Sequence, residues 1–255
     1  MCLVLLARDI HPQYRTIIAA NRDEFYERPT DPLAPWADRP SVLAGRDLSS
    51  GGTWMGVTRG GRFGAVTNFR DPANKVSGAP SRGGLVSGFL VSKSSATDYV
   101  ESIRVEAGTF NGFNLLTDDG DETVWFSNRG DDPIKLVSGL YGLSNNLIDV
   151  PWPKVEKAKR GFKDTLQFSG DDLVQSLLAL LGDREAPPDE TLPETGIGID
   201  WERILSPIFI TSPVYGTRSS SVVLIDREGV VTFVEQIFEK GSAQEPPRSY
   251  SFSID

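Results

Sequence analysis

The order of apolar segments along the chain is the feature that most constrains its fold. Strand-like runs come first, at Cys2 to Ala7 and at Arg15 to Ala20, and two more at 53–58 and 63–67 flank a glycine-containing turn. Helical patterns follow at 83–93 and 96–105, strands at 112–117 and 123–127, helices at 154–162 and 173–181, and a last hairpin at 219–226 and 230–236. Because strand and helix do not alternate strictly, a parallel doubly wound sheet is disfavoured. The order predicts α+β architecture, with two layers of mainly antiparallel sheet and helices outside.

Turn-forming residues fill the remaining segments. The chain has 25 glycines and 17 prolines in 255 residues, which suits a fold rich in strands and turns. We expect a proline-rich coil from Arg28 to Pro40 and an acidic surface loop from Asp183 to Asp200. Ser81 and Ser95 are expected to cap the two helices that follow them. No repeat or linker interrupts the chain, so we predict a single domain over residues 1–255.

Composition narrows the function classes. A net charge of −9 argues against binding to a nucleic-acid backbone. No apolar run reaches the roughly 18–20 residues of a membrane span, and the start lacks the basic region of a secretory signal. One cysteine allows no internal disulfide and suits a reducing compartment, so we expect a cytoplasmic protein.

Cys2 is the only cysteine, and its place in the chain is unusual. Removal of Met1 would make it the first residue, with a thiol nucleophile and an α-amine base on one residue. Those groups ordinarily titrate near pH ~8.5 and ~7.7–8.0, so either exchanges a proton near neutral pH. The alternative is that Cys2 is a small residue that begins a buried strand.

The scarcity of histidine removes other chemistries. His11 is the only histidine and lies in a turn-like stretch, so we expect it to be an exposed loop residue. Structural zinc needs about four Cys or His ligands, more than Cys2 and His11 supply, and no EF-hand spacing is present. We therefore expect no metal site.

Seven stretches spread over the chain together resemble the NRDE family, whose eukaryotic members are called transport and Golgi organisation protein 2. They are Met1-Cys2, Ala20-Asn21-Arg22-Asp23-Glu24, Ala44-Gly45-Arg46-Asp47-Leu48 with Gly51-Gly52-Thr53-Trp54-Met55-Gly56, Val66-Thr67-Asn68-Phe69-Arg70, Ser81-Arg82-Gly83, Gly142-Leu143-Ser144-Asn145-Asn146 with Pro151-Trp152-Pro153-Lys154-Val155, and Tyr215-Gly216-Thr217-Arg218-Ser219-Ser220. The resemblance implies an N-terminal-nucleophile hydrolase-like fold, which is a four-layer αββα sandwich. Within that fold it points to the choloylglycine hydrolase and penicillin V acylase group, whose members begin with cysteine and cleave amides.

That group carries a Gly-Arg-Asn-x-Asp pattern at the end of its second strand. This chain matches it at Asn21 and Asp23, but Ala20 stands where arginine is expected. Arg22 is adjacent, and we expect its side chain on the other face of the extended strand. Arg218 resembles another active-site arginine of the group and is the candidate to replace the missing cation.

The resemblance implies a role for each candidate catalytic residue. The Cys2 thiol attacks a carbonyl, its α-amine moves the proton, and Asp23 holds that amine. Asn68 and Asn145 carry N–H donors suited to an oxyanion hole, although asparagine at either position also suits a turn. Asn21, Arg22, Trp54 and Phe69 are the candidate substrate-binding residues.

Two functions from different classes remain open. One is a cysteine amidohydrolase or acyltransferase acting on a small C–N amide. The other is a non-catalytic carrier, because the resemblance also implies roles in haem trafficking and in lipid or acyl-CoA homeostasis. We expect no resident cofactor; haem is a candidate ligand of the carrier. The partner is a small molecule in both cases, and the oligomeric state stays open.

Overall fold

The computed structural model describes residues 2–255, which fall into two compact units. The first unit contains the chain up to Glu27 together with Ser138–Ser144 and Ile148–Ser251. The second contains Arg28–Val137, Asn145–Leu147 and Phe252–Asp255. The single domain expected over 1–255 stays a prediction, and each unit is described by itself.

One antiparallel sheet organises the first unit. Its strand order is β10-β1-β2-β11-β12-β13, and β14 pairs with β12. The strands are β1 (Cys2–Arg8), β2 (Tyr14–Phe25), β10 (Gly139–Leu143), β11 (Tyr215–Asp226), β12 (Val230–Glu239), β13 (Ser242–Ala243) and β14 (Arg248–Ser253). The helices that accompany them are α3 (Pro153–Thr165), α4 (Gly170–Leu181) and α5 (Ile199–Leu205).

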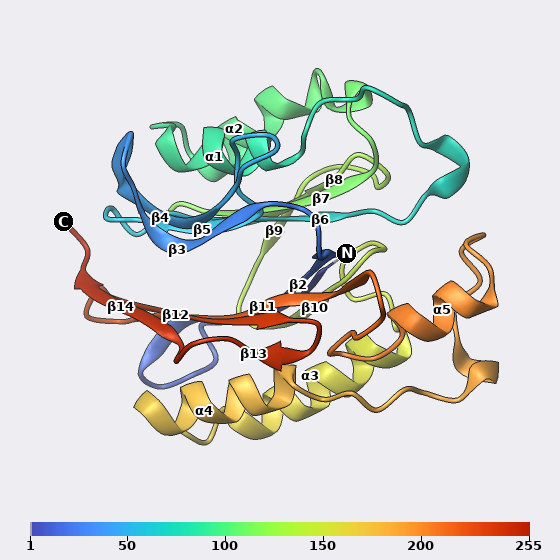
Figure 1. The fold of residues 1–255 in the computed structure, drawn as a ribbon. Helices are drawn as coiled ribbons and strands as arrows, with labels where there is room; N and C mark the ends of the chain where they lie inside the picture. The colour runs from blue at the N-terminus through green and yellow to red at the C-terminus, as the bar shows by residue number, and fades with distance from the viewer. Residues whose placement is uncertain (1) are drawn as a thin grey trace. The chain divides into compact units, whose positions relative to one another are not determined.

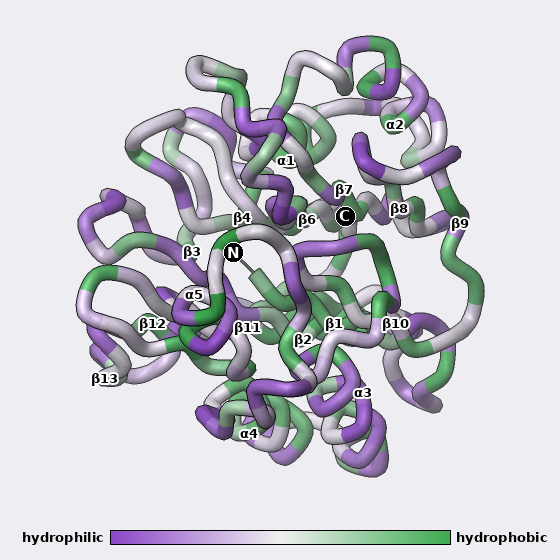
Figure 2. The backbone as a smooth tube through the Cα atoms, turned by 90° about the vertical axis from the view of Figure 1, so that its right-hand side faces the viewer, coloured by the Kyte–Doolittle hydropathy of each residue, from purple (hydrophilic) through white to green (hydrophobic). Residues whose placement is uncertain are grey.

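Helices α3 and α4 cover one face of this sheet (Figure 1). Alternate strand residues, including Leu3, Leu5 and Ala19, form a buried cluster with Phe162 and Leu177 of the helices. Because successive strand residues point to opposite faces, Cys2 lies on the face that α3 and α4 do not cover. Figure 2 shows β1 hydrophobic over most of its length and α3 mainly hydrophilic, as expected for a helix with one buried side.

The second unit contains its own antiparallel sheet with strand order β3-β4-β5-β6-β7-β8-β9. The strands are β3 (Thr30–Trp36), β4 (Arg39–Asp47), β5 (Met55–Thr58), β6 (Phe63–Asn68), β7 (Phe113–Asp118), β8 (Thr123–Ser127) and β9 (Ile134–Leu136). Helices α1 (Gly83–Val91) and α2 (Ala96–Arg104) pack on it. The buried cluster beneath them includes Phe89, Val100 and Phe113.

Two local expectations are wrong. The stretch from Arg28 to Pro40 is not coil, because it contains β3 and the start of β4. An edge strand tolerates proline, and the buried side chains of Leu33 and Trp36 anchor β3. Ser81 does not cap α1, whose N-cap position is Arg82, whereas Ser95 caps α2 by accepting a hydrogen bond from the Asp98 amide.

The expected α+β fold class is confirmed. Residues 2–255 contain five α-helices and two sheets whose recorded strand pairings are antiparallel. None of the helices in this range is long and apolar enough to cross a membrane.

Candidate active site

Cys2 and Arg22 are a cross-strand pair. In the antiparallel register of β1 and β2, Cys2 lies directly opposite Arg22. Directly opposite residues project from the same face of a sheet, so the thiol and the guanidinium are neighbours. Arg22 thus projects, as predicted, from the face of β2 opposite to Asn21 and Asp23, and this is the face on which the Cys2 thiol lies. Both residues are buried, with exposed fractions of 8% for Cys2 and 7% for Arg22.

A β-bulge brings Arg218 to the same place. Thr217 pairs with Asp23 and Ser219 pairs with Arg22, so Arg218 is the extra residue on β11. Bulges of this kind re-aim a side chain. Burial and then the positive charge of Arg22 lower the pKa of Arg218, so the two guanidinium groups are close enough to repel. The Arg218 Nη1 atom donates to the Phe25 carbonyl at 2.9 Å.

Asp23 follows Arg22 and projects from the opposite face of β2. Its Oδ1 atom accepts a hydrogen bond from Thr217 Oγ1 at 2.7 Å, and its backbone carbonyl accepts one from the Tyr215 hydroxyl at 2.7 Å. The residue is 1% exposed, and burial raises the pKa of its carboxyl. β2 therefore carries a cation and a carboxylate on consecutive residues.

Asn21 lies on the same face of β2 as Asp23, and its side-chain amide is hydrogen-bonded to other residues of the protein. The Nδ2 atom donates to the carbonyls of Leu181 and Ile208, each at 2.9 Å. The Oδ1 atom accepts from Ser220 Oγ at 2.6 Å. These bonds attach β2 to the end of α4 and to the segment before β11. Asn21 is thus placed as a structural residue, and its substrate-binding role stays a prediction that these bonds disfavour.

Opposing influences act on the Cys2 thiol. Burial raises its pKa, the negative charge of Asp23 raises it further, and the positive charge of Arg22 lowers it. The backbone carbonyl of Cys2 accepts a hydrogen bond from Ser144 Oγ at 3.2 Å. Removal of Met1, which would free the Cys2 amine, concerns a residue outside the described range.

The structure brings Asn68 and Asn145 together within the second unit. The Asn145 Nδ2 atom donates to the Asn68 carbonyl at 2.7 Å, and the Arg70 amide donates to the Asn145 carbonyl at 2.7 Å. Phe69 follows Asn68, and its amide donates to the Gly112 carbonyl. Trp54 is partly buried against the cluster under α1 and α2. The oxyanion role of the two asparagines and the substrate-binding roles of Trp54 and Phe69 stay predictions.

Three residues of the site were missed. Thr217 and Tyr215 bind Asp23, and Lys154 is a buried lysine, 5% exposed, whose charge lowers the pKa of Asp23. All three belong to stretches that carry the family resemblance, Pro151 to Val155 and Tyr215 to Ser220. Their sequence positions alone gave no sign that they converge.

His11 is not an exposed loop residue, contrary to expectation. It is 3% exposed, and its Nδ1 atom accepts hydrogen bonds from the amides of Gln13 and Tyr14 at 3.1 and 3.2 Å. An accepting Nδ1 leaves the proton on Nε2, which lies 3.1 Å from the Phe168 carbonyl. Both ring nitrogens are therefore engaged in holding the β1–β2 turn against the segment between α3 and α4.

Metal chemistry and a separate pocket are two further possibilities. Within residues 2–255, no three His, Cys, Asp or Glu side chains are grouped to hold a metal ion.

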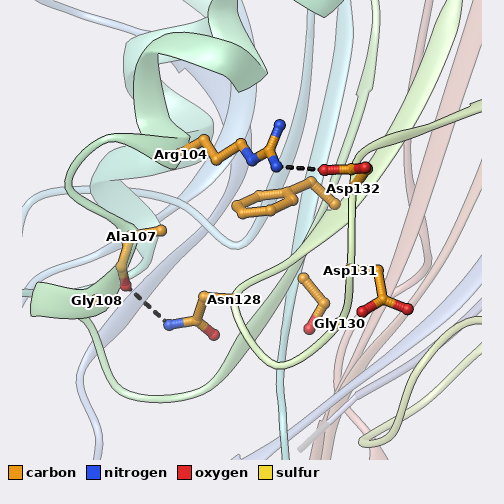
Figure 3. A pocket seen from close by; sticks show the side chains of 9 residues that line it. Arg104, Ala107, Gly108, Asn128, Gly130, Asp131 and Asp132 are labelled. Atoms are coloured by element: carbon orange, nitrogen blue, oxygen red, sulfur yellow. Dashed lines mark hydrogen bonds and ion pairs between the residues drawn. The ribbon is translucent and has the colours of Figure 1, made fainter.

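A pocket of about 530 Å³ in the second unit is lined by residues that include Arg104, Asn128 and Asp132 (Figure 3). Arg104 pairs with Asp132, and Asn128 Nδ2 donates to the Ala107 carbonyl at 2.9 Å. These polar groups bind one another, and the predicted site residues are not among the lining.

Comparisons with known proteins agree on one family. The family model described as Transport and Golgi organisation 2 matches residues 1–240. The chain is 36% identical over 276 residues to the Transport and Golgi organization protein 2 homolog of Homo sapiens, covering 100% of this chain and 99% of that protein. It is 34% identical over 279 residues to the Mus musculus homolog, with the same coverage.

A solved structure shows the fold. The Caenorhabditis elegans N-acylethanolamine-hydrolyzing acid amidase ortholog superposes with a TM-score of 0.51 and 11% identity, over 88% of this chain and 92% of that chain. The expected N-terminal-nucleophile hydrolase-like fold is thereby confirmed.

Proposed function

This chain belongs to the transport and Golgi organisation 2 family, and we propose that it is a cysteine N-terminal-nucleophile amidohydrolase acting on a small acylated amide. The observation that carries the proposal is the pairing of Cys2 with Arg22, with Arg218 beside them at the bulge. Cations next to a thiol favour its thiolate, which is the nucleophilic form. The likeness in fold to a protein named for hydrolysing N-acylethanolamines supports the choice of a C–N amide.

The proposed reaction starts from the chain without Met1. The Cys2 Sγ atom attacks the amide carbonyl carbon and forms a C–S bond, while the thiol proton passes to the Cys2 α-amine. That proton then moves to the leaving nitrogen as the C–N bond breaks, which releases an amine and leaves a thioester. Water attacks the thioester to give a carboxylic acid and restore the thiol; a second amine in place of water would give acyl transfer.

In this scheme Asp23 orients the α-amine of Cys2. A buried carboxylate next to an amine favours its charged form and fixes its direction. The hydrogen bonds from Thr217 and Tyr215 hold Asp23 in place on β2. Arg22 and Arg218 are on the thiol side, where they stabilise negative charge on sulfur or on a carboxylate of the substrate.

The test is hydrolysis of a panel of N-acylethanolamines, N-acyl amino acids, penicillin V and conjugated bile amides. We expect amine release from at least one of them, and its loss in Cys2→Ser. A matched control keeps the thiol but carries extra residues before Cys2, which ties the α-amine into a peptide bond. That extended chain should also be inactive. Equal turnover by wild type and Cys2→Ser would exclude a catalytic thiol.

One observation favours a carrier as the second candidate. Burial raises the pKa of the Cys2 thiol, which disfavours the nucleophilic thiolate. Haem fits poorly, because both ring nitrogens of His11 are engaged and burial disfavours the thiolate that would ligate iron. Acyl-CoA remains, with Arg22 and Arg218 as cations for its phosphates. Acyl-CoA binding that is unchanged in Cys2→Ser, with no hydrolysis across the panel, would favour the carrier. The cytoplasmic location inferred from the single cysteine stays a prediction.

A further inference from the structure

We propose that Lys154 is a positioning residue for Asp23, because its buried ammonium supplies the countercharge that keeps the Asp23 carboxylate ionised. The inference rests on the proposed function, in which Asp23 holds the α-amine of Cys2. It assigns a role to a lysine in the first turn of α3.

Lys154 is held in place from two sides. It is the second residue of α3, directly after Pro153, whose fixed φ suits the first position of a helix. Its Nζ atom donates to the Leu205 carbonyl at the end of α5, at 3.0 Å, and the residue is 5% exposed. A carbonyl is a neutral acceptor, so this bond does not cancel the ammonium charge. A buried charge requires an opposite charge nearby.

A small apolar cluster connects Lys154 to Asp23. Leu205, which accepts the lysine hydrogen bond, packs with Ile210 and Tyr215 in one buried group. The hydroxyl of Tyr215 donates to the Asp23 carbonyl at 2.7 Å. Lys154 and Asp23 are therefore both bonded to members of the same group.

Thr217 joins this group to the Asp23 carboxylate itself. Its Oγ1 atom accepts from the Ile210 amide at 2.9 Å and donates to Asp23 Oδ1 at 2.7 Å. Because both charged groups are shielded from water, each acts on the other more strongly than surface charges do.

The charges around Asp23 come from several elements. Burial raises the pKa of its carboxyl, and the positive charge of Lys154 on α3 lowers it, as does that of Arg22 on β2. The Cys2 thiol on β1 interacts with Asp23 as well. Glu202 on α5 is the other buried carboxylate of this region, at 4% exposed. The α-amino group of the unprocessed chain belongs to Met1, outside the described residues.

Lys154 thus opposes the effect of burial on Asp23. Arg22 projects from the other face of β2 and beside the thiol, so Lys154 is the cation on the carboxylate's own side of the sheet. Without Lys154, Asp23 would take up a proton at a higher pH, and a neutral carboxyl would no longer hold the Cys2 ammonium.

The experiment measures the Asp23 titration directly, by carbon-13 NMR of side-chain carboxyls in the chain that starts at Cys2. The Asp23 signal is assigned by its loss in Asp23→Asn. In Lys154→Met, which keeps the length of the side chain and removes the charge, we expect the midpoint to rise by about one pH unit. The control is Lys157→Met on the same helix, whose ammonium pairs with Asp183 and Glu185, each at 2.6 Å. It should leave the midpoint unchanged.

Further variants keep the proposal falsifiable. Lys154→Arg retains the charge and should restore the midpoint to near the wild-type value. If circular dichroism shows that Lys154→Met does not fold, Lys154→Gln replaces it. An unmoved midpoint, or an equal rise in Lys157→Met, overturns the proposal; an unmoved midpoint is also the result expected if Lys154 serves Glu202 instead.

A second readout separates this proposal from the proposed function. The rate of Cys2 alkylation, followed against pH, needs no substrate, and the pH at which ionisation of Asp23 changes that rate should rise in Lys154→Met. If the Asp23 midpoint shifts in Lys154→Met but the protein hydrolyses no amide, the proposed function is wrong and the Lys154–Asp23 coupling is supported. If the protein hydrolyses an amide but the midpoint does not shift, the coupling is wrong and the proposed function is supported.

Discussion

Cys2 on β1 and Arg22 on β2 lie directly opposite each other, so a thiol and a guanidinium share one face of the sheet. The hydrolase pattern resembled by this chain has its arginine two residues earlier, where Ala20 stands opposite Val4. Positions 20 and 22 project from the same face of a strand. Moving the cation by two residues therefore keeps it on the thiol face and brings it level with Cys2.

Replacing Arg22 should lower the rate at which the Cys2 thiol is alkylated. The positive charge of Arg22 lowers the pKa of Cys2, so its loss raises that pKa and reduces the thiolate fraction. In Arg22→Met we expect alkylation by iodoacetamide near neutral pH to be about tenfold slower, the effect of one pKa unit. Arg15→Met, at the other end of β2, is the matched control and should react like wild type. Unchanged reactivity in Arg22→Met would mean that the pair has no electrostatic effect on sulfur.

Thr217 is expected to matter through its hydroxyl. The Oγ1 atom donates to the Asp23 carboxyl and accepts from the Ile210 amide. Thr217→Val therefore removes one hydrogen bond from each of these two buried groups. A loss of about 1–3 kcal/mol in the free energy of unfolding follows, measured by urea denaturation. Thr217→Ser keeps the hydroxyl and should lose clearly less. A loss in Thr217→Ser as large as that in Thr217→Val would show that the hydroxyl contributes no more than the methyl group.

Asp23 should make stability depend on pH. Its pKa is raised in the folded protein, so the folded state binds the proton more tightly than the unfolded chain does. This contribution is present below the unfolded pKa and is lost as pH rises through the folded pKa. Asp23→Asn should therefore gain stability relative to wild type as pH rises above the unfolded pKa of an aspartate, about 3.9. Asp172→Asn on the exposed side of α4 serves as the control, and a parallel pH dependence of Asp23→Asn and wild type would refute the raised pKa.

Gly216 sits where the chain has no room for a side chain. A Cβ atom there would lie 2.7 Å from the Ile210 carbonyl and closer still to the Tyr26 hydroxyl. We expect Gly216→Ala to cost about 1–3 kcal/mol in thermal or urea unfolding. Gly84→Ala is the comparison, because nothing lies within 4 Å of a Cβ at that position of α1. That variant should be neutral or slightly stabilising.

Local patterns predicted much of the fold. The hairpin at 53–67, the helices at 83–105 and the last hairpin at 219–236 have strong periodicity and turn residues between them, and all three are present. Strand β3 was missed because its prolines read as coil, although an edge strand does not need every amide. Helix α5 was missed because it is short and follows an acidic, proline-containing loop.

The arrangement of the site depends on contacts between residues that are far apart in the sequence. The register between β1 and β2 decides whether Arg22 lies on the same face as Cys2, and a slip of one residue would place the two side chains on opposite faces. The burial of His11 depends on a carbonyl 157 residues away, at Phe168. Thr217 and Tyr215 donate hydrogen bonds to Asp23, and the charge of Lys154 acts on it, although all three are distant from Asp23 in the sequence. The residue types were visible in the sequence, whereas their convergence required the packing of α3 on β1 and β10 and the pairing of β11 with β2.

The extra residue at Arg218 sets the phase of the strand that follows it. Ser219 to Ile225 pair with β2 in unbroken register. Because Arg218 has no partner residue of its own on β2, Ser219 projects from the face opposite to Thr217. Deleting Arg218 would leave a regular ladder, in which Thr217 still pairs with Asp23 and Ser219 still pairs with Arg22. The bulge thus adds a guanidinium to β11 without using any of its paired positions. A deletion within 219–225 is different, because it would move the residues on one side of the gap to the opposite face of the sheet. One-residue gaps in this strand among functional relatives should therefore fall at Arg218 rather than within 219–225.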